Sequence, residues 1–181
     1  MRVPLQLHPD SRGGAVSRIT VEVARQSATA LVLHYFVTGR IGTLNLAPPA
    51  APERADALWE HSCFEAFVRR SSAGADDGYY ELNFAPSTQW AAYRFSDYRE
   101  GMEAAAELDP PRIETNASDL YFQLRASFDL PDDGPWRLGL AAVIEEENRR
   151  KSWWALAHPP GKPDFHHQDC FAVDLPAAQQ T

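Results

Sequence analysis

The chain has 181 residues and a formal net charge of −8, from 17 basic and 25 acidic side chains. This length suits one domain with a substantial core, and we expect residues 1–181 to form that single domain. The acidic balance argues against a nucleic-acid-binding protein, which needs a basic surface to displace counterions. The sequence shows neither an apolar signal segment nor a run as long as a membrane helix, so we expect a cytoplasmic protein without a membrane partner.

Alternating apolar and polar side chains predict strands along most of the chain. The stretches with this pattern are residues 18–23, 29–38, 61–70, 79–84, 90–95, 112–115, 120–130, 136–144, 151–157 and 171–175. Residues 71–78 and 131–135 are predicted turns, and the prolines of residues 47–52 predict a loop. Short helical turns are expected within residues 53–58 and 96–108. Since no helices alternate with the strands, a parallel sheet would lack its crossovers. The predicted fold is therefore all-β, an antiparallel β-sandwich of the jelly-roll kind.

The hairpin at residues 78–95 carries the clearest mixture of polar and aromatic side chains. Its first strand alternates so that Glu81 and Asn83 share one face. We expect Trp90 and Arg94 of the second strand to join them on that face. An acid, an amide, a guanidinium and an indole together suit a polar ligand with flat apolar patches, such as a sugar. The alternative is an ordinary half-buried hairpin with a solvated outer face.

Three further tryptophans stand out for a chain of this length. Trp59 ends a loop, where its ring can lie over a cleft. Trp153 and Trp154 are adjacent, so in a strand they point to opposite faces, and the sequence does not say which one faces a site. Two facing indoles form a slot for a sugar ring, because the C–H face of a sugar packs on an aromatic plane. The alternative is that all are structural, since tryptophan is usually largely buried.

The loop at residues 158–169 concentrates histidines and aspartates. Its side chains could ligate a divalent metal, but their spacing matches no standard zinc pattern. A proline-pinned loop whose histidines bond the backbone explains them better, and we predict neither a metal nor a cofactor. A third interpretation places His158, Asp164 and His166 on the rim of a ligand site.

Glu65 and Glu81 raise the question of a glycosidase pair, in which two carboxylates flank the scissile bond. If their strands are neighbours, the two side chains can share a face. Paired carboxylates can equally bind hydroxyl groups, and the sequence contains no other hydrolase or nucleotide-binding motif. Cys63 and Cys170 are expected to be buried thiols rather than a disulfide.

Three segments carry a family resemblance, and together they span most of the chain. They are LWEHSCFEAF at residues 58–67, YYELNFAPSTQWAAYRFSDYR at 79–99 and SWWALAHPPGKPDFHHQDCF at 152–171. The chain resembles the DOMON-like superfamily and, within it, the family 9 carbohydrate-binding modules. The resemblance implies a jelly-roll sandwich that binds sugar ends between two tryptophans, with polar contacts from acid, amide and arginine side chains. The positions that match are Trp59, Glu65, Glu81, Asn83 and Arg94, followed by Trp90 and Trp154.

These observations favour a non-catalytic protein that binds a small soluble molecule, a sugar or a sugar-like metabolite. One alternative is an enzyme acting on a sugar derivative, with Glu65 and Glu81 as acid and base. The other is a haem- or metal-binding domain that uses His158, His166 or His167, because some DOMON domains bind haem through methionine and histidine. The sequence gives no indication of the oligomeric state.

Overall fold

The computed structural model describes residues 1–12, 14–71 and 78–178, and within them it is built almost entirely of antiparallel strands. The strands are β1 (Arg2–Leu7), β2 (Val16–Arg25), β3 (Ala30–Gly39), β4 (Cys63–Arg70), β5 (Tyr79–Phe84), β6 (Trp90–Phe95), β7 (Glu103–Ala104), β8 (Arg112–Ala117), β9 (Tyr121–Asp129), β10 (Trp136–Glu145), β11 (Lys151–Ala155) and β12 (Val173–Leu175). The helical elements in these ranges are short 3-10 turns at Ile41–Thr43, Leu58–Glu60 and Gln168–Cys170. In this described part, no helix has the length and apolar character needed to cross a membrane.

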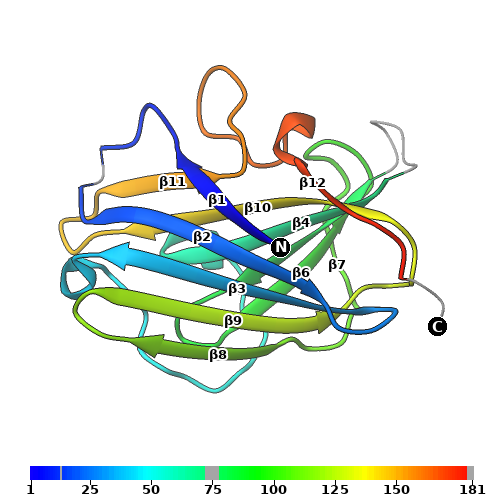
Figure 1. Cartoon of the computed structure of the whole chain (residues 1–181), viewed down its shortest axis with the longest axis horizontal. Coiled ribbons are helices and arrows are strands. Elements are labelled where there is room, and N and C mark those ends of the chain that lie inside the picture. Colours follow the sequence, from blue (N-terminus) through cyan, green and yellow to red (C-terminus); the bar gives the residue numbers. More distant parts are fainter. Residues whose placement is uncertain (13, 72–77, 179–181) are drawn as a thin grey trace.

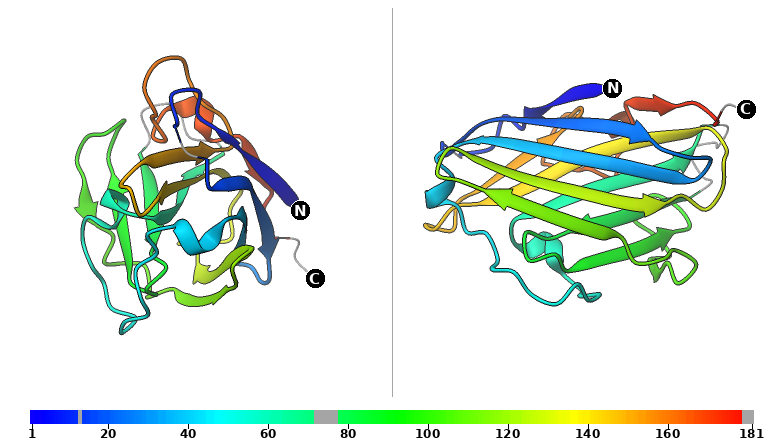
Figure 2. Two further views of the ribbon diagram at one scale, coloured as in Figure 1. Left: turned by 90° about the vertical axis from the view of Figure 1, so that its left-hand side faces the viewer. Right: turned by 60° about the horizontal axis from the view of Figure 1, so that its bottom comes forward.

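The strands form one 12-stranded sheet that curls into two layers (Figures 1 and 2). Along the sheet the strand order is β7-β6-β5-β4-β10-β11-β1-β2-β3-β9-β8, and β12 adds to β10. Layer A consists of β2, β3, β9 and β8, and layer B of β7, β6, β5, β4, β10, β11 and β12. Strand β1 joins the layers, because it pairs with β2 on one side and with β11 on the other. The predicted all-β, antiparallel sandwich is confirmed.

The main core lies between the two layers and is apolar. It contains fully buried side chains from both layers, including Leu33, Tyr35 and Leu124 from layer A and Phe64 and Leu140 from layer B. Removal of this apolar surface from water supplies the main driving force for the two layers to close. The one polar group of this set, the Tyr35 hydroxyl, donates a hydrogen bond of 2.8 Å to the backbone carbonyl of Glu65.

A second apolar cluster lies on the outer face of layer B, away from the main core. We call it the outer cluster, and it consists of Phe67, Tyr79, Ala91, Tyr93, Phe95, Ala141, Val143, Ala155, Phe165 and Phe171. Phe165 and Phe171 belong to the loop between β11 and β12, which therefore covers part of this face. As a result β4, β5 and β10 are buried on both faces, and polar side chains on their outer face are buried as well.

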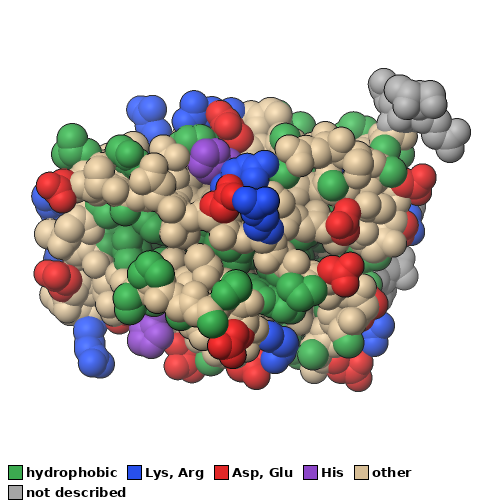
Figure 3. Space-filling view, turned by 90° about the horizontal axis from the view of Figure 1, so that it is seen from below, with side chains coloured by type: hydrophobic (Ala, Val, Ile, Leu, Met, Phe, Trp, Pro, Cys, Tyr) green, Lys and Arg blue, Asp and Glu red, His purple; other side chains and the backbone are tan. Residues whose placement is uncertain are grey.

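The face seen from below in Figure 3 has a different character, with charged side chains of both signs spread among hydrophobic ones.

Four sequence-based expectations need correction or comment. Strand β1 was not predicted, because it buries only Leu5 and so has a weak apolar signal. The helical turn expected within 53–58 lies at Leu58–Glu60. Residues 96–108 form an irregular loop with β7, because Arg99 and Gly101 have positive φ angles of 56° and 63°, which end any right-handed helix. Most of the turn predicted at 71–78, namely residues 72–77, lies outside the described residues.

Candidate functional site

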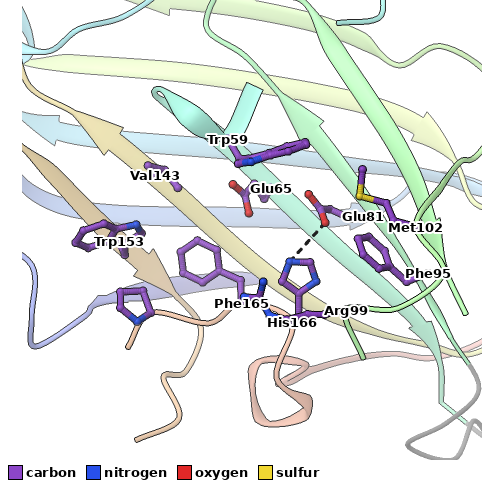
Figure 4. Close-up of a pocket in the computed structure, with 11 residues that line it drawn as sticks. Trp59, Glu65, Glu81, Phe95, Arg99, Met102, Val143, Trp153, Phe165 and His166 are labelled. Atoms are coloured by element: carbon purple, nitrogen blue, oxygen red, sulfur yellow. Dashed lines mark ion pairs between the residues drawn. The ribbon is translucent and has the colours of Figure 1, made fainter. Parts of the chain in front are cut away.

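A pocket of about 390 Å³ opens on the outer face of layer B (Figure 4). The strands contribute Glu65, Glu81, Phe95, Val143 and Trp153 to its lining. The connecting segments contribute Trp59, Arg99, Met102, Pro163, Phe165 and His166. The pocket therefore combines two acids, a guanidinium and an imidazole with aromatic walls, and each group comes from a different part of the sequence.

Glu65 lies on β4, where Phe64 and Ala66 on either side point into the main core and Glu65 points outward. Its side chain is buried, with the residue only 3% exposed, and its Oε1 atom has no hydrogen-bond partner among the described residues. Burial raises the pKa of Glu65 well above its usual range, and the charge of Glu81 raises it further. This carboxyl group therefore keeps its proton to a higher pH than an ordinary glutamate.

Glu81 lies on the neighbouring strand β5, diagonally across from Glu65. Asn83 sits directly opposite Glu65 in the ladder, and Glu81 is two residues before it, so both acids face outward. The Oε1 atom of Glu81 accepts a hydrogen bond of 2.8 Å from Asn83 Nδ2. Burial raises the pKa of Glu81, while the Asn83 hydrogen bond and the charge of Arg99 oppose that rise. The two acids thus share a face but differ in how far their charge is compensated.

His166 joins the loop after β11 to the acids of the strand layer. Its Nε2 atom lies 3.7 Å from Glu81 Oε2 (Figure 4), and its Nδ1 atom lies 2.7 Å from the Tyr79 hydroxyl. Burial, followed by the charge of Arg99, lowers the pKa of His166 to about 4, so the ring is neutral at pH 7. The Arg99 backbone N–H donates to the same Tyr79 oxygen at 3.2 Å, so this phenol connects His166 to the segment that carries Arg99.

Arg99 lines the pocket, but its charge is already paired. Its guanidinium donates to Asp164 Oδ1 at 2.8 Å, and the Tyr98 hydroxyl donates to the other oxygen of the same carboxylate. Burial alone would raise the pKa of Asp164, but the bonds from Tyr98 and Arg99 together hold it below its usual range. Asp164 therefore contributes to the pocket by fixing Arg99 rather than by lining the cavity.

Aromatic side chains form the walls of the pocket. Trp59 is 37% exposed and rests edge-on against Tyr93, with ring centroids 5.7 Å apart. In Figure 4, Trp59 lies on one side of the two carboxyl groups, and Phe165 and His166 lie on the other. Trp153 is half-buried beside Phe165 at the end of the pocket nearest β11. A flat ligand entering this pocket would meet aromatic surface before it reached the acids.

The two adjacent tryptophans of β11 have separate roles. Trp153 lines the pocket, whereas Trp154 is buried in the main core and donates a hydrogen bond of 3.0 Å from Nε1 to Ser152 Oγ. Adjacent residues of a strand point to opposite faces, so only one of them can reach the pocket. The resemblance pointed to Trp154, and the structure places that side chain away from the pocket.

The expectation that Trp90 and Arg94 share the face of Glu81 is wrong. In the β5–β6 ladder, Trp90 is opposite Phe84 and Arg94 is opposite Tyr80, so both lie on the side of the main core. Trp90 is buried in that core, and Arg94 is exposed at the edge, where it forms an ion pair of 3.0 Å with Glu103. The residues of β6 on the outer face are Tyr93 and Phe95.

The remaining predicted residues divide between the site and its surroundings. Asn83 is fully buried and holds Glu81 without lining the pocket. His158 lies elsewhere, with Nε2 at 2.8 Å from the Gln6 carbonyl and its ring 4.8 Å from that of His8. Within the described ranges, no three or more His, Cys, Asp or Glu side chains cluster in a way that could hold a metal ion. Of the loop residues proposed for the rim, only His166 reaches the cavity.

Several lining residues were not anticipated from the sequence. Arg99, Met102, Pro163 and Phe165 come from irregular segments, where no periodic pattern indicates orientation. Trp153 could have been found from alternation alone if the register of β11 had been known. The alternation of β6 does indicate the orientation of Phe95, because it places Phe95 on the same face as Tyr93 and opposite to Arg94.

Comparison with known proteins gives a likeness in fold. No protein-family model matches the chain, and no curated protein matches it in sequence. Among solved structures, it is similar to a family 9 carbohydrate-binding module from Caldicellulosiruptor kristjanssonii in complex with cellotriose. The identity is 13%, the TM-score is 0.50, and the match covers 88% of this chain and 75% of that one.

A structure described as a family 9 module from the same organism in complex with glucose is also similar, at 14% identity and a TM-score of 0.48, covering 87% and 76% of the two chains. These comparisons concern family 9 modules and do not extend to the DOMON-like superfamily. The chain therefore has a fold similar to that of the family 9 carbohydrate-binding module seen with cellotriose.

Proposed function

We propose that this protein binds a sugar or sugar-like small molecule, without transforming it, in the pocket on the outer face of layer B. One observation carries the proposal: two indoles, Trp59 and Trp153, line the same cavity as two buried carboxyl groups, Glu65 and Glu81. A volume of about 390 Å³ falls within the range of small-molecule sites.

The chemistry of the lining suits a sugar. Aromatic planes pack against the C–H faces of a pyranose, and buried polar groups bond its hydroxyls. Glu65 Oε1 has no partner among the described residues, so a ligand hydroxyl would satisfy a group that is otherwise costly to bury. Glu81 is already oriented by Asn83, and a fixed carboxyl group loses little entropy when a ligand binds.

The likeness in fold supports the same proposal. The module from Caldicellulosiruptor kristjanssonii with a TM-score of 0.50 was solved with cellotriose. A pocket on one face of a similar sandwich is consistent with a carbohydrate ligand here. The ligand we propose is small and soluble, since the acids lie buried at the bottom of the pocket rather than along an open surface.

Isothermal titration calorimetry against a panel of mono- and disaccharides tests this proposal. We expect heat of binding with at least one sugar, and its loss in Glu81→Ala. Glu103→Ala is the matched control, because Glu103 is an exposed acid on β7 that does not line the pocket. The absence of heat with every sugar, in a folded protein, would contradict the proposal.

A second candidate function follows from the unequal environments of the two acids. Glycoside hydrolysis uses one carboxyl group that retains its proton and one that is ionised. Glu65, with its strongly raised pKa, would be the acid and Glu81 the base. The two residues occupy diagonal positions on neighbouring strands, so both carboxyl groups face the same cavity. Incubation with aryl glycosides tests this candidate, and a hydrolysis rate unchanged in Glu65→Gln would contradict it.

A further inference from the structure

We infer that the ligand of this pocket carries a protonated amine, as an amino sugar does. The inference rests on the proposed function, because it specifies the class of sugar that the same pocket binds. It is drawn from the charges of the lining, from one unpartnered buried oxygen and from the aromatic groups around it.

The two acids of the lining lack a cationic partner that is free to pair with them. Two acids, Glu65 and Glu81, face the cavity, and the one guanidinium on its lining, Arg99, is held by Asp164 at 2.8 Å. His166 is neutral at pH 7 and so adds no positive charge. Burial favours the protonated form of Glu65 while the pocket is empty. A cation delivered by the ligand would let this carboxyl group ionise as one half of a pair, since buried carboxylates are stable only when they are paired.

Glu65 marks the place for that cation. The residue is 3% exposed and lines the pocket, and its Oε1 atom has no hydrogen-bond partner among the described residues. Glu81 differs, because one of its oxygens already accepts a bond from Asn83. An ammonium group offers three N–H donors, so it can satisfy Glu65 and bond Glu81 from one position between them.

The walls of the pocket favour a cation as well. Trp59 and Phe165 lie on opposite sides of the carboxyl groups, and Trp153 lies near Phe165 (Figure 4). Aromatic faces attract a cation through their quadrupole, and the attraction is stronger where water is excluded. A hydroxyl group in the same position would gain the hydrogen bonds but neither the charge pairing nor the cation–π attraction.

The experiment compares sugars that differ in a single group. Calorimetry at pH 7 uses glucosamine, galactosamine and mannosamine, each alongside its parent hexose and its N-acetyl derivative. At least one amino sugar should bind about tenfold more tightly than its parent hexose, because a hydrogen bond to a charged group is worth more than a neutral one. The N-acetyl derivative, which has no charge, should lose this advantage.

A matched variant assigns the preference to Glu65. Glu65→Gln keeps the shape and the hydrogen-bonding capacity but cannot ionise when a cation binds, so the preference should fall toward equality while the parent hexose still binds. Glu22→Gln changes the net charge equally on the exposed face of β2, in layer A, and should leave the preference intact. If Glu65→Gln does not fold, Glu81→Gln serves the same purpose.

The outcomes separate this inference from the proposed function. If hexoses bind as tightly as their amino sugars, the amine inference is overturned and the sugar-binding proposal stands. If the preference for the amine survives in both Glu65→Gln and Glu81→Gln, the recognition of the amine by these acids is overturned. If no sugar of any class binds, the proposed function itself fails.

Discussion

Glu81 Oε2 and His166 Nε2 lie 3.7 Å apart, and this approach connects strand β5 to the loop that follows β11. The imidazole is oriented from its other side by the Tyr79 hydroxyl at 2.7 Å from Nδ1. A neutral ring in this position turns Nε2 toward the acid without adding a charge to the pocket. His166 therefore joins this loop to two residues of β5, Tyr79 and Glu81, on the outer face of layer B.

The buried His166 ring should make the stability of the protein depend on pH. Its pKa is about 4 in the folded protein, against 6.5 for an ordinary histidine, so the unfolded chain binds the proton first as the pH falls. The stability from keeping this ring neutral is complete above pH 6.5 and is lost as the pH falls toward 4, by roughly 3 kcal/mol at most.

The variant His166→Asn isolates this effect, because its amide group can hydrogen-bond Tyr79 as donor or acceptor but does not titrate. We expect the stability of the natural protein relative to the variant to fall between pH 6.5 and pH 4, as measured by urea unfolding. Parallel stability curves for the two proteins would show that the ring is not held neutral.

Glu65 should make the stability of the protein change with pH in the opposite direction to His166. Its pKa is raised in the folded protein, so the unfolded chain releases the proton first and stability decreases as the pH rises above the ordinary value of 4.5. We expect Glu65→Gln to be more stable than the natural protein at pH 8, with a smaller difference at pH 5, as measured by thermal unfolding. Glu81→Gln should gain less, because Asn83 and Arg99 offset the burial of Glu81. A Glu65→Gln advantage independent of pH would contradict this account.

Alternation along the strands was sufficient to predict the outward face of β4 and β5. Glu65, Glu81 and Asn83 share that face because side chains in a strand alternate strictly, whatever the strand pairs with. The same rule could not place Trp90 and Arg94. Their face depends on the register of β6 against β5, which the connection between these strands sets, and one residue of slip reverses every orientation.

The pocket itself could not be derived from the sequence, because irregular segments close it. Arg99 reaches the cavity from a residue with a φ angle of 56°, a conformation that no periodic pattern indicates. Phe165 and His166 cover the outer face from a loop rich in proline, and their side chains are oriented by packing rather than by local rules. The sequence therefore indicated the acids and left the walls around them undetermined.

The adjacent tryptophans of β11 allow a test in which one residue serves as the control for the other. Trp153→Ala should weaken sugar binding with little change in thermal stability, because Trp153 is half-buried at the pocket. Trp154→Ala should lower the free energy of unfolding by about 3–5 kcal/mol, because it leaves a cavity in the main core. Calorimetry and denaturant unfolding of both variants measure the two effects. A greater loss of stability in Trp153→Ala than in Trp154→Ala would contradict the placement.

Arg99 and Arg94 are close in sequence but should differ in their effect on sugar binding. Arg99 lines the pocket and is held toward it by Asp164, whereas Arg94 pairs with Glu103 at the edge of layer B. We expect Arg99→Ala to weaken sugar binding about tenfold, the value of a hydrogen bond from a charged group, and Arg94→Ala to leave the dissociation constant unchanged. Equal effects of the two substitutions would contradict this assignment.

The two cysteines should be unreactive in the folded protein. Cys63 and Cys170 are free thiols, and both are buried. Burial raises the pKa of Cys63 well above its usual range and that of Cys170 to about 12, so neither forms a thiolate at neutral pH. We expect Ellman's reagent to titrate no thiol in the native protein and two after unfolding in guanidinium chloride. Rapid reaction of either thiol in the native protein would contradict this arrangement.

The separation of the outer cluster from the main core has a consequence for protein engineering. Trp59, Arg99 and Phe165 belong to connecting segments on one side of a sheet whose opposite side holds the sandwich together. Trp59 and Arg99 are exposed, so randomising these two positions would alter specificity at little cost in folding yield, whereas Phe165 is buried in the outer cluster and is best retained. The fold offers a scaffold on which new receptors can be selected from a small combinatorial library.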